Sequence, residues 1–253
     1  MSEERASNYN NSHRAFLQVF LSKSVLTFES ARPMLANLMT AQEGRETLTN
    51  DITEAVFNNY VSICNNAISP FDLEIRSTLS QHDRKRVYAL VNTTSDPATQ
   101  LATTHTPEEI SYLKRVLDAM FETYNTAREE VMAITSLQAL RLTRAPRTEM
   151  QNGEATQGSV GQGLTQSQAE RMLDSLVAEG WFELSQNGYY SLSPRALMEL
   201  RGWLLETYNE PVDEEDEDDE RIERVKLCRA CKEIVTVVCW PSRRHSSARA
   251  YVN

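Results

Sequence analysis

The sequence predicts a mostly α-helical protein with small β hairpins, built from tandem winged-helix domains and a cysteine-bearing C-terminal segment. Two observations lead to this prediction. Helical patterns followed by an alternating pattern with a polar turn occur twice along the chain, which is the order of elements in a winged helix. Three of the four cysteines fall within the last 26 residues, beginning with the pair Cys228 and Cys231. This Cys-x-x-Cys spacing is half of a tetrahedral zinc site.

Composition and charge set the broad class of the protein. With 40% hydrophobic and 25% charged residues among 253, the chain is typical of a soluble globular protein. Residues 1–11 are polar, and no apolar run approaches the roughly 20 residues that cross a bilayer, so we expect an intracellular protein without membrane contact. The net charge is −10: residues 1–212 carry −8, residues 213–220 another −8, and residues 221–253 carry +6. Such an acidic body disfavours strong autonomous DNA binding.

The helices of the first winged-helix domain are expected within residues 13–104, after a disordered N-terminus at 1–12. Pro33 is tolerated only in the first turn of a helix, so the second helix is predicted to start near Ser30. Asp51 as N-cap, with Glu54 three residues later, predicts the start of the third helix. Cys64 lies on the apolar face of that helix and is expected to be a small core residue. The stripe of the first helix consists of Phe16, Leu17, Phe20 and Leu21.

The second winged-helix domain is expected at residues 105–209. Thr106, Pro107 and Glu109 form a capping box that starts its first helix, and a shorter apolar stretch follows at 131–142. Residues 147–163 are polar and Gly-rich, which predicts a flexible insertion. A helix then runs from Leu164 to Gly180, and Ser193-Pro194 starts the last one.

Each domain ends its helical part with a predicted hairpin. In the first, alternating residues at 73–79 and 87–91 flank the polar turn 81–85. In the second, the strands 181–184 and 189–192 flank Asn187-Gly188, the strongest short hairpin signal. An acidic linker is expected next at 210–224, because its like charges repel and favour an extended chain.

Winged helices bind either duplex DNA or proteins, and the outward-facing side chains distinguish the two. A duplex reader needs basic or amide side chains on the recognition helix and a basic wing. The second domain offers only Gln166, Gln168 and Arg171 on that helix, and its turn 185–187 has no Lys or Arg. The hairpin of the first domain does contain Arg84, Lys85 and Arg86 at its polar turn. We therefore favour a protein-interaction role, with direct DNA contact as the alternative.

Several stretches resemble a known family. The first runs from Leu164-Thr165-Gln166-Ser167-Gln168-Ala169-Glu170 to Glu179-Gly180-Trp181, and the second from Gly188 to Leu200. The acidic stretch and the Cys-x-x-Cys pair follow. Over about residues 13–231 the chain resembles the non-structural maintenance of chromosomes element 1 family. The resemblance implies a nuclear subunit of the complex built on structural-maintenance-of-chromosomes proteins five and six, which acts in DNA repair by recombination. It also implies a MAGE-like element 3 partner and a variant RING domain that supports ubiquitin transfer from a conjugating enzyme.

A RING holds two zinc ions through four ligand pairs in a cross-braced order. Cys228 and Cys231 match the family's first pair, Cys239 and His245 are candidates for the second, and no further pair precedes Asn253. Residues 225–253 are therefore expected to be an incomplete, truncated RING-like segment, unfolded because structural zinc supplies folding energy. Two alternatives stay open: a single zinc site made of all four residues, or a splice or frame shift that changes the end of the chain.

Three functions follow from these patterns. They are a RING-type ubiquitin ligase subunit, a structural subunit that has lost its ligase end, and a winged-helix DNA-binding regulator. The histidines form no catalytic constellation, because His13 begins a helix, His82 lies in a hairpin turn and His105 in a loop. Ile234 is placed where a ubiquitin-conjugating enzyme would touch a RING, although core packing is the favoured role.

Overall fold

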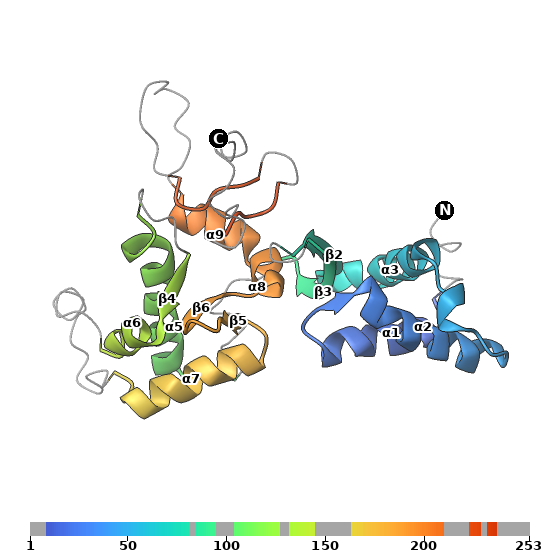
Figure 1. The fold of residues 1–253 in the computed structure, drawn as a ribbon, viewed down its shortest axis with the longest axis horizontal. Helices are drawn as coiled ribbons and strands as arrows, with labels where there is room; N and C mark the ends of the chain where they lie inside the picture. Colours follow the sequence, from blue (N-terminus) through green and yellow to red (C-terminus); the bar gives the residue numbers. More distant parts are fainter. Residues whose placement is uncertain are drawn as a thin grey trace, which may run out of the picture. The chain divides into compact units, whose positions relative to one another are not determined.

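The computed structural model describes residues 9–80, 84–94, 104–126, 132–144, 163–209, 223–228 and 232–236. The chain divides into two compact units, Met1–Thr94 and Ser95–Asn253 (Figure 1). Each unit is mainly helical and contains a three-stranded antiparallel sheet. The predicted class, mostly helical with small hairpins, is therefore confirmed. No described helix is both long enough and apolar enough to span a membrane.

The first unit packs its helices against one face of its sheet around an aromatic core. Phe16 on the first helix meets Phe57 and Tyr60 on the third, edge to face, with ring centroids 5.8 Å apart in both pairs. Cys64 is fully buried among them, as predicted. The elements are α1 (Asn11–Ser22), β1 (Leu26–Thr27), α2 (Phe28–Glu43), a 3₁₀ turn (Thr49–Asp51), α3 (Glu54–Ile68), a second 3₁₀ turn (Ser69–Phe71), β2 (Leu73–Leu79) and β3 (Arg86–Asn92).

Two helix starts differ from the prediction because side-chain caps lie elsewhere. α2 begins after Thr27, which exchanges hydrogen bonds with Ser30, so Pro33 lies in the second turn rather than the first. α3 begins after Thr53 rather than Asp51, because the Asp51 carboxylate accepts from the Leu48 amide within the preceding 3₁₀ turn. The apolar stripe of α1 is also narrower than expected, since Leu21 is 73% exposed.

The first hairpin is confirmed over the predicted residues. β2 and β3 pair from Leu73 opposite Asn92 to Leu79 opposite Arg86. An unpredicted third strand, β1, pairs with the other edge of β3, which gives the order β1-β3-β2. The Asn65 side chain ties α3 to β2, because its Oδ1 accepts from the Ile75 amide at 2.7 Å and its Nδ2 donates to the Ile75 carbonyl at 3.1 Å.

The second unit repeats the order of the first: a helix, a short strand, two helices and a hairpin. The strand order β4-β6-β5 again places the last strand in the centre. The predicted capping box holds, because the Thr106 amide donates to Glu109 at 2.8 Å. The elements are α5 (Pro107–Asp118), a π-helical turn η4 (Ala119–Thr123), β4 (Ala133–Thr135), α6 (Ser136–Arg141), α7 (Gln166–Ala178), β5 (Phe182–Leu184), β6 (Tyr189–Leu192), α8 (Pro194–Glu199) and α9 (Arg201–Tyr208).

The insertion predicted at 147–163 starts and ends at neighbouring points of the second unit. Residues 145–162 lie outside the described part of the chain. Gly163 lies so close to Thr143 that a Cβ atom there would collide with the Thr143 carbonyl. Arg115 on α5 holds the chain just before the insertion, because its Nε donates to the Leu142 carbonyl at 2.8 Å.

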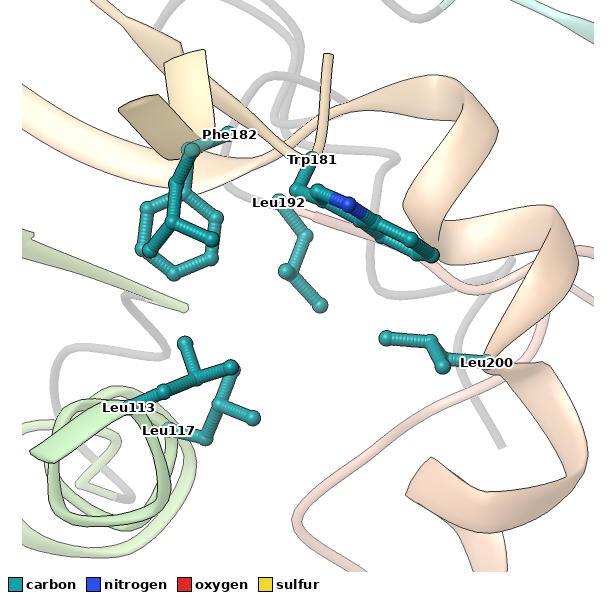
Figure 2. A pocket seen from close by; sticks show the side chains of 7 residues that line it. Leu113, Leu117, Trp181, Phe182, Leu192 and Leu200 are labelled. Atoms are coloured by element: carbon teal, nitrogen blue, oxygen red, sulfur yellow. The ribbon is translucent and has the colours of Figure 1, made fainter. Parts of the chain in front are cut away.

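A small apolar cavity lies inside the core of the second unit. Its volume is about 10 Å³, which is the space of one water molecule and far below a ligand pocket. Figure 2 shows side chains from α5, from the hairpin and from the α8–α9 junction pointing toward it. The lining residues are Leu113, Leu117, Leu176, Trp181, Phe182, Leu192 and Leu200.

Candidate functional site

The helices that precede the hairpins, α3 and α7, offer little that binds a phosphate backbone. α3 contains no Lys or Arg. On α7, the Gln168 side chain accepts from both the amide and the hydroxyl of Thr165, and Arg171 donates its Nε to the Ser167 carbonyl at 3.2 Å. Two of the three candidate base-reading side chains therefore bond to their own helix, and only Gln166 extends outward without such a bond among the described residues.

The two hairpin tips differ in chemistry. In the first unit, Arg84, Lys85 and Arg86 are exposed, and Arg86 donates to the Ser77 hydroxyl at 3.1 Å. In the second unit, the tip exposes Leu184 and Tyr189, at 48% and 42%. α6 begins beside this tip, where the Ser136 amide donates to the Gly188 carbonyl, and Leu137 is 70% exposed. The exposure of these apolar side chains was not predicted from the sequence.

The described residues of the C-terminal segment, 223–228 and 232–236, are folded onto the second unit. Val225 and Ile234 are 1% and 3% exposed and belong to the core of that unit, and Figure 1 shows their short red stretches beside α9. The expectation of an unfolded remnant is therefore wrong for residues 225–228 and 232–236. Buried apolar side chains hold these residues in place. The prediction considered only the incomplete set of zinc ligands and not this burial. Ile234 is a core residue, as favoured.

Residues 226–228 and 232–235 pair as the two sides of a cysteine-bearing turn. The Cys228 amide donates to the Glu233 carbonyl and the Lys232 amide donates to the Cys228 carbonyl, both at 2.8 Å. Leu227 pairs with Ile234, and Lys232 takes the left-handed conformation, with φ of 60°. Cys228 is half-buried in this turn. The other predicted zinc ligands, Cys231, Cys239 and His245, lie outside the described residues.

Three side chains of the second unit fasten this segment to its surface. Asn209, the residue after α9, bonds to the backbone of Arg224 and Val225, and Asn125 bonds to the Arg224 carbonyl. Arg201 donates to the Lys232 carbonyl at 3.0 Å. Asn209 also forms a β-bridge with Glu223, so residues 210–222, which are not described, start and end at paired positions. No sequence signal marked these residues.

The remaining candidate side chains are structural. Burial raises the pKa of the Cys64 thiol to about 12, which makes it a poor nucleophile or ligand. His105 lies in the loop before α5, as predicted, but its side chain is only 6% exposed between Glu109 and Glu179, with Nε2 3.2 Å from the Glu179 carboxylate. His13 lies in the first turn of α1, as predicted, and is buried. Within the described ranges, no three His, Cys, Asp or Glu side chains gather as a metal site.

Two helix–sheet units with the same order of elements, the second of which holds residues 223–228 and 232–236 through side-chain hydrogen bonds, define the class of protein. The family model described as Nse1 non-SMC component of SMC5-6 complex matches residues 13–200. The chain belongs to this family, which confirms the resemblance drawn from the sequence.

Similar proteins agree with this assignment at low identity. The Non-structural maintenance of chromosomes element 1 homolog of Xenopus tropicalis is 21% identical over 205 residues, covering 81% of this chain and 66% of that protein. The corresponding Schizosaccharomyces pombe protein is 23% identical over 214 residues, covering 85% and 79%. This chain thus spans about two thirds of the length of the Xenopus relative. A chain of a solved Nse1-Nse3-Nse4 complex has the same fold, with a TM-score of 0.62, 20% identity, and coverage of 92% of this chain and 90% of that one.

Proposed function

We propose that this chain is the Nse1 subunit of an SMC5-6 complex and serves there mainly as a protein-docking scaffold. The observation that carries the proposal is the family match over residues 13–200, which runs through both helix–sheet units. The solved relative belongs to an Nse1-Nse3-Nse4 complex, which supports a MAGE-like Nse3 and an Nse4 subunit as partners. A nuclear location and a role in DNA repair by recombination follow from this membership.

Each unit is a winged helix in this proposal, with domain limits at 13–104 and 105–209. The order of helix, strand, two helices and hairpin supports this, as does the central place of the last strand in each sheet. The hairpins are then the wings, and α3 and α7 are the helices that would read a duplex in a DNA-binding member.

The chemistry of these helices favours protein partners over direct DNA contact. α3 has no cationic side chain, and on α7 the Gln168 Oε1 and the Arg171 Nε are bonded within their own helix and its cap, which leaves Arg171 as the single cation of the two helices to meet a phosphate. The second wing exposes Leu184 and Tyr189, and apolar and aromatic side chains are enriched at the centres of protein interfaces. DNA is reached through other subunits of the complex.

Zinc binding belongs to the proposal through Cys228, Cys231, Cys239 and His245. The described part of the set fits, because Cys228 sits half-buried in a tight turn, as structural zinc ligands do. Zinc would supply folding energy to the segment. In a RING-type ligase, this segment would position a ubiquitin-conjugating enzyme. The pure scaffold is the stronger alternative, because Ile234 is buried in the second unit instead of offered to such an enzyme.

Co-purification tests the docking role. We expect the full chain to elute with Nse3 and Nse4 as one species in size-exclusion chromatography with light scattering. The triple variant Arg84→Glu, Lys85→Glu, Arg86→Glu serves as the matched control and should assemble equally well. Salt-dependent duplex binding by the chain alone, abolished in this variant, would instead support the DNA-binding regulator.

Zinc content and autoubiquitination separate the ligase from the scaffold. We expect Cys228→Ser to lose the zinc that the purified chain retains, and Cys64→Ala to keep it, because Cys64 is a core residue. Less than about half an ion per unmodified chain would refute the single site. Ubiquitin chains formed by the assembled complex, and lost in Cys228→Ser, would favour the ligase over the scaffold.

A further inference from the structure

Four backbone groups of the C-terminal segment are all bonded by two asparagine side chains. Asn209 Oδ1 accepts from the amides of Arg224 and Val225, at 3.1 and 2.9 Å, and its Nδ2 donates to the Val225 carbonyl at 3.0 Å. Asn125 Nδ2 donates to the Arg224 carbonyl at 2.8 Å. The backbone amides and carbonyls of Arg224 and Val225 are therefore all hydrogen-bonded although neither residue pairs with a regular strand. This permits Val225 to be buried.

A second attachment lies on the other side of the cysteine. Arg201, the first residue of α9, donates to the Lys232 carbonyl, and Ile234 two residues later is buried in the core of the same unit. The amide of Val235 closes the hairpin by donating to the Lys226 carbonyl at 2.9 Å. Cys228 therefore lies between two anchors, and its own amide and carbonyl are both bonded within the turn.

We propose that Asn209 and Asn125 form a clasp that makes the cysteine-bearing turn an integral part of the second unit, with Asn209 as its positioning residue. The clasp bonds to backbone groups, so it fixes where residues 224 and 225 lie without depending on their side chains. A partner that binds this turn then meets it at a fixed place relative to α9. Asn209 and Glu223, which flank the acidic run in the sequence, are bridged to each other. The clasp requires no zinc and goes beyond the proposed function.

Hydrogen exchange measured by mass spectrometry on the full chain tests the clasp, with Asn209→Ala as the main variant. Losing three bonds to buried backbone groups should speed exchange in residues 223–228 and 232–236 by at least about tenfold. Exchange in α7 should rise much less, because none of the bonds of the clasp reaches that helix. Asn125→Ala, which loses one bond, should give a smaller increase in the same stretches.

Asn65→Ala is the matched control, because Asn65 makes the same kind of paired backbone bonds to Ile75 in the first unit. It should speed exchange near Ile75 and leave residues 223–236 unchanged. Alkylation of Cys228 with N-ethylmaleimide, in the presence of a chelator so that bound zinc does not mask the thiol, should be faster in Asn209→Ala than in the unmodified chain. Cys64 should stay unlabelled in both.

Three outcomes would overturn the clasp: exchange of 223–236 in the unmodified chain at the rate of an unstructured peptide, no change in Asn209→Ala, or an equal rise in α7. If Asn209→Ala does not fold, the Asn125→Ala result decides alone. Zinc content is measured separately, so a chain without zinc but with a working clasp refutes only the proposed zinc site.

Discussion

In each unit, one asparagine side chain bonds to backbone groups that have no neighbouring strand on that side. A carboxamide holds a donor and an acceptor side by side, so it matches the paired groups of an extended backbone. Asn65 uses this match to hold Ile75 against α3, and Asn209 uses it to hold Val225 beside α9. Asparagine is common in turns and loops, which is why neither residue was predicted from the sequence to have this role.

His13 links the stability of the first unit to pH. It stacks on Tyr60 with ring centroids 4.3 Å apart, and its Nε2 is buried without a hydrogen-bond partner among the described residues. Burial lowers its pKa below the ordinary 6.5. The unfolded chain therefore binds a proton more readily than the folded one, and stability is fully present above about pH 6.5 and declines as pH falls from there toward the folded pKa.

We expect the free energy of unfolding of the first unit to decrease as pH falls from about 7 to 5.5, measured by urea titration with unfolding followed by hydrogen-exchange labelling of α1 and α3. His13→Phe keeps an aromatic ring against Tyr60 and should remove most of this decrease. A decrease of equal size in the variant would assign the effect to other groups.

Local sequence patterns predicted the helix starts and hairpins that depend on interactions within a few residues. The two hairpins and the start of α5 were correct, because alternation, Asn187-Gly188 and the Thr106 capping box act within a few residues. The strands β1 and β4, of two and three residues, were missed, since each is defined by pairing with a strand far along the chain. The docked C-terminal segment was missed for the same reason.

The insertion after α6 offers a test of element independence. Gly163 lies against the backbone of Thr143, so the chain enters and leaves the insertion at one place. Replacing residues 145–162 with a linker of about four Gly and Ser residues should leave the fold intact and stabilise it by roughly 1 kcal/mol, because a shorter loop costs less entropy to close. The thermal midpoint of the second unit measures this.

Deletion of α6, residues 136–141, is the contrasting variant. It contributes the fully buried Ala139, whose carbonyl accepts from the Tyr112 hydroxyl at 3.1 Å, so its loss should unfold the unit. A large loss of stability on removing 145–162 would mean that the insertion contributes packing of its own.

The whole molecule consists of two units with separate cores. The core of the first is aromatic and centred on α1 and α3, whereas the core of the second gathers side chains from α5 to α9 and from the C-terminal segment. Residues from both sides of the acidic run contribute to that second core. The sequence therefore predicted the number of helix–sheet units, but it assigned the residues after the acidic run to a separate zinc segment.

Truncation after Asn209 should consequently weaken one unit only. It removes Val225 and Ile234 from the core of the second unit, and full burial of two such side chains is worth roughly 3–5 kcal/mol as an upper estimate. We expect the second unit to unfold at a lower urea concentration and the first unit to keep its midpoint, each followed by hydrogen exchange of its own helices. The double variant Val225→Ala, Ile234→Ala should reproduce most of the loss, because it leaves the acidic run in place. Equal destabilisation of both units would show that they unfold together, and an unchanged second unit would show that the C-terminal segment contributes nothing to its core.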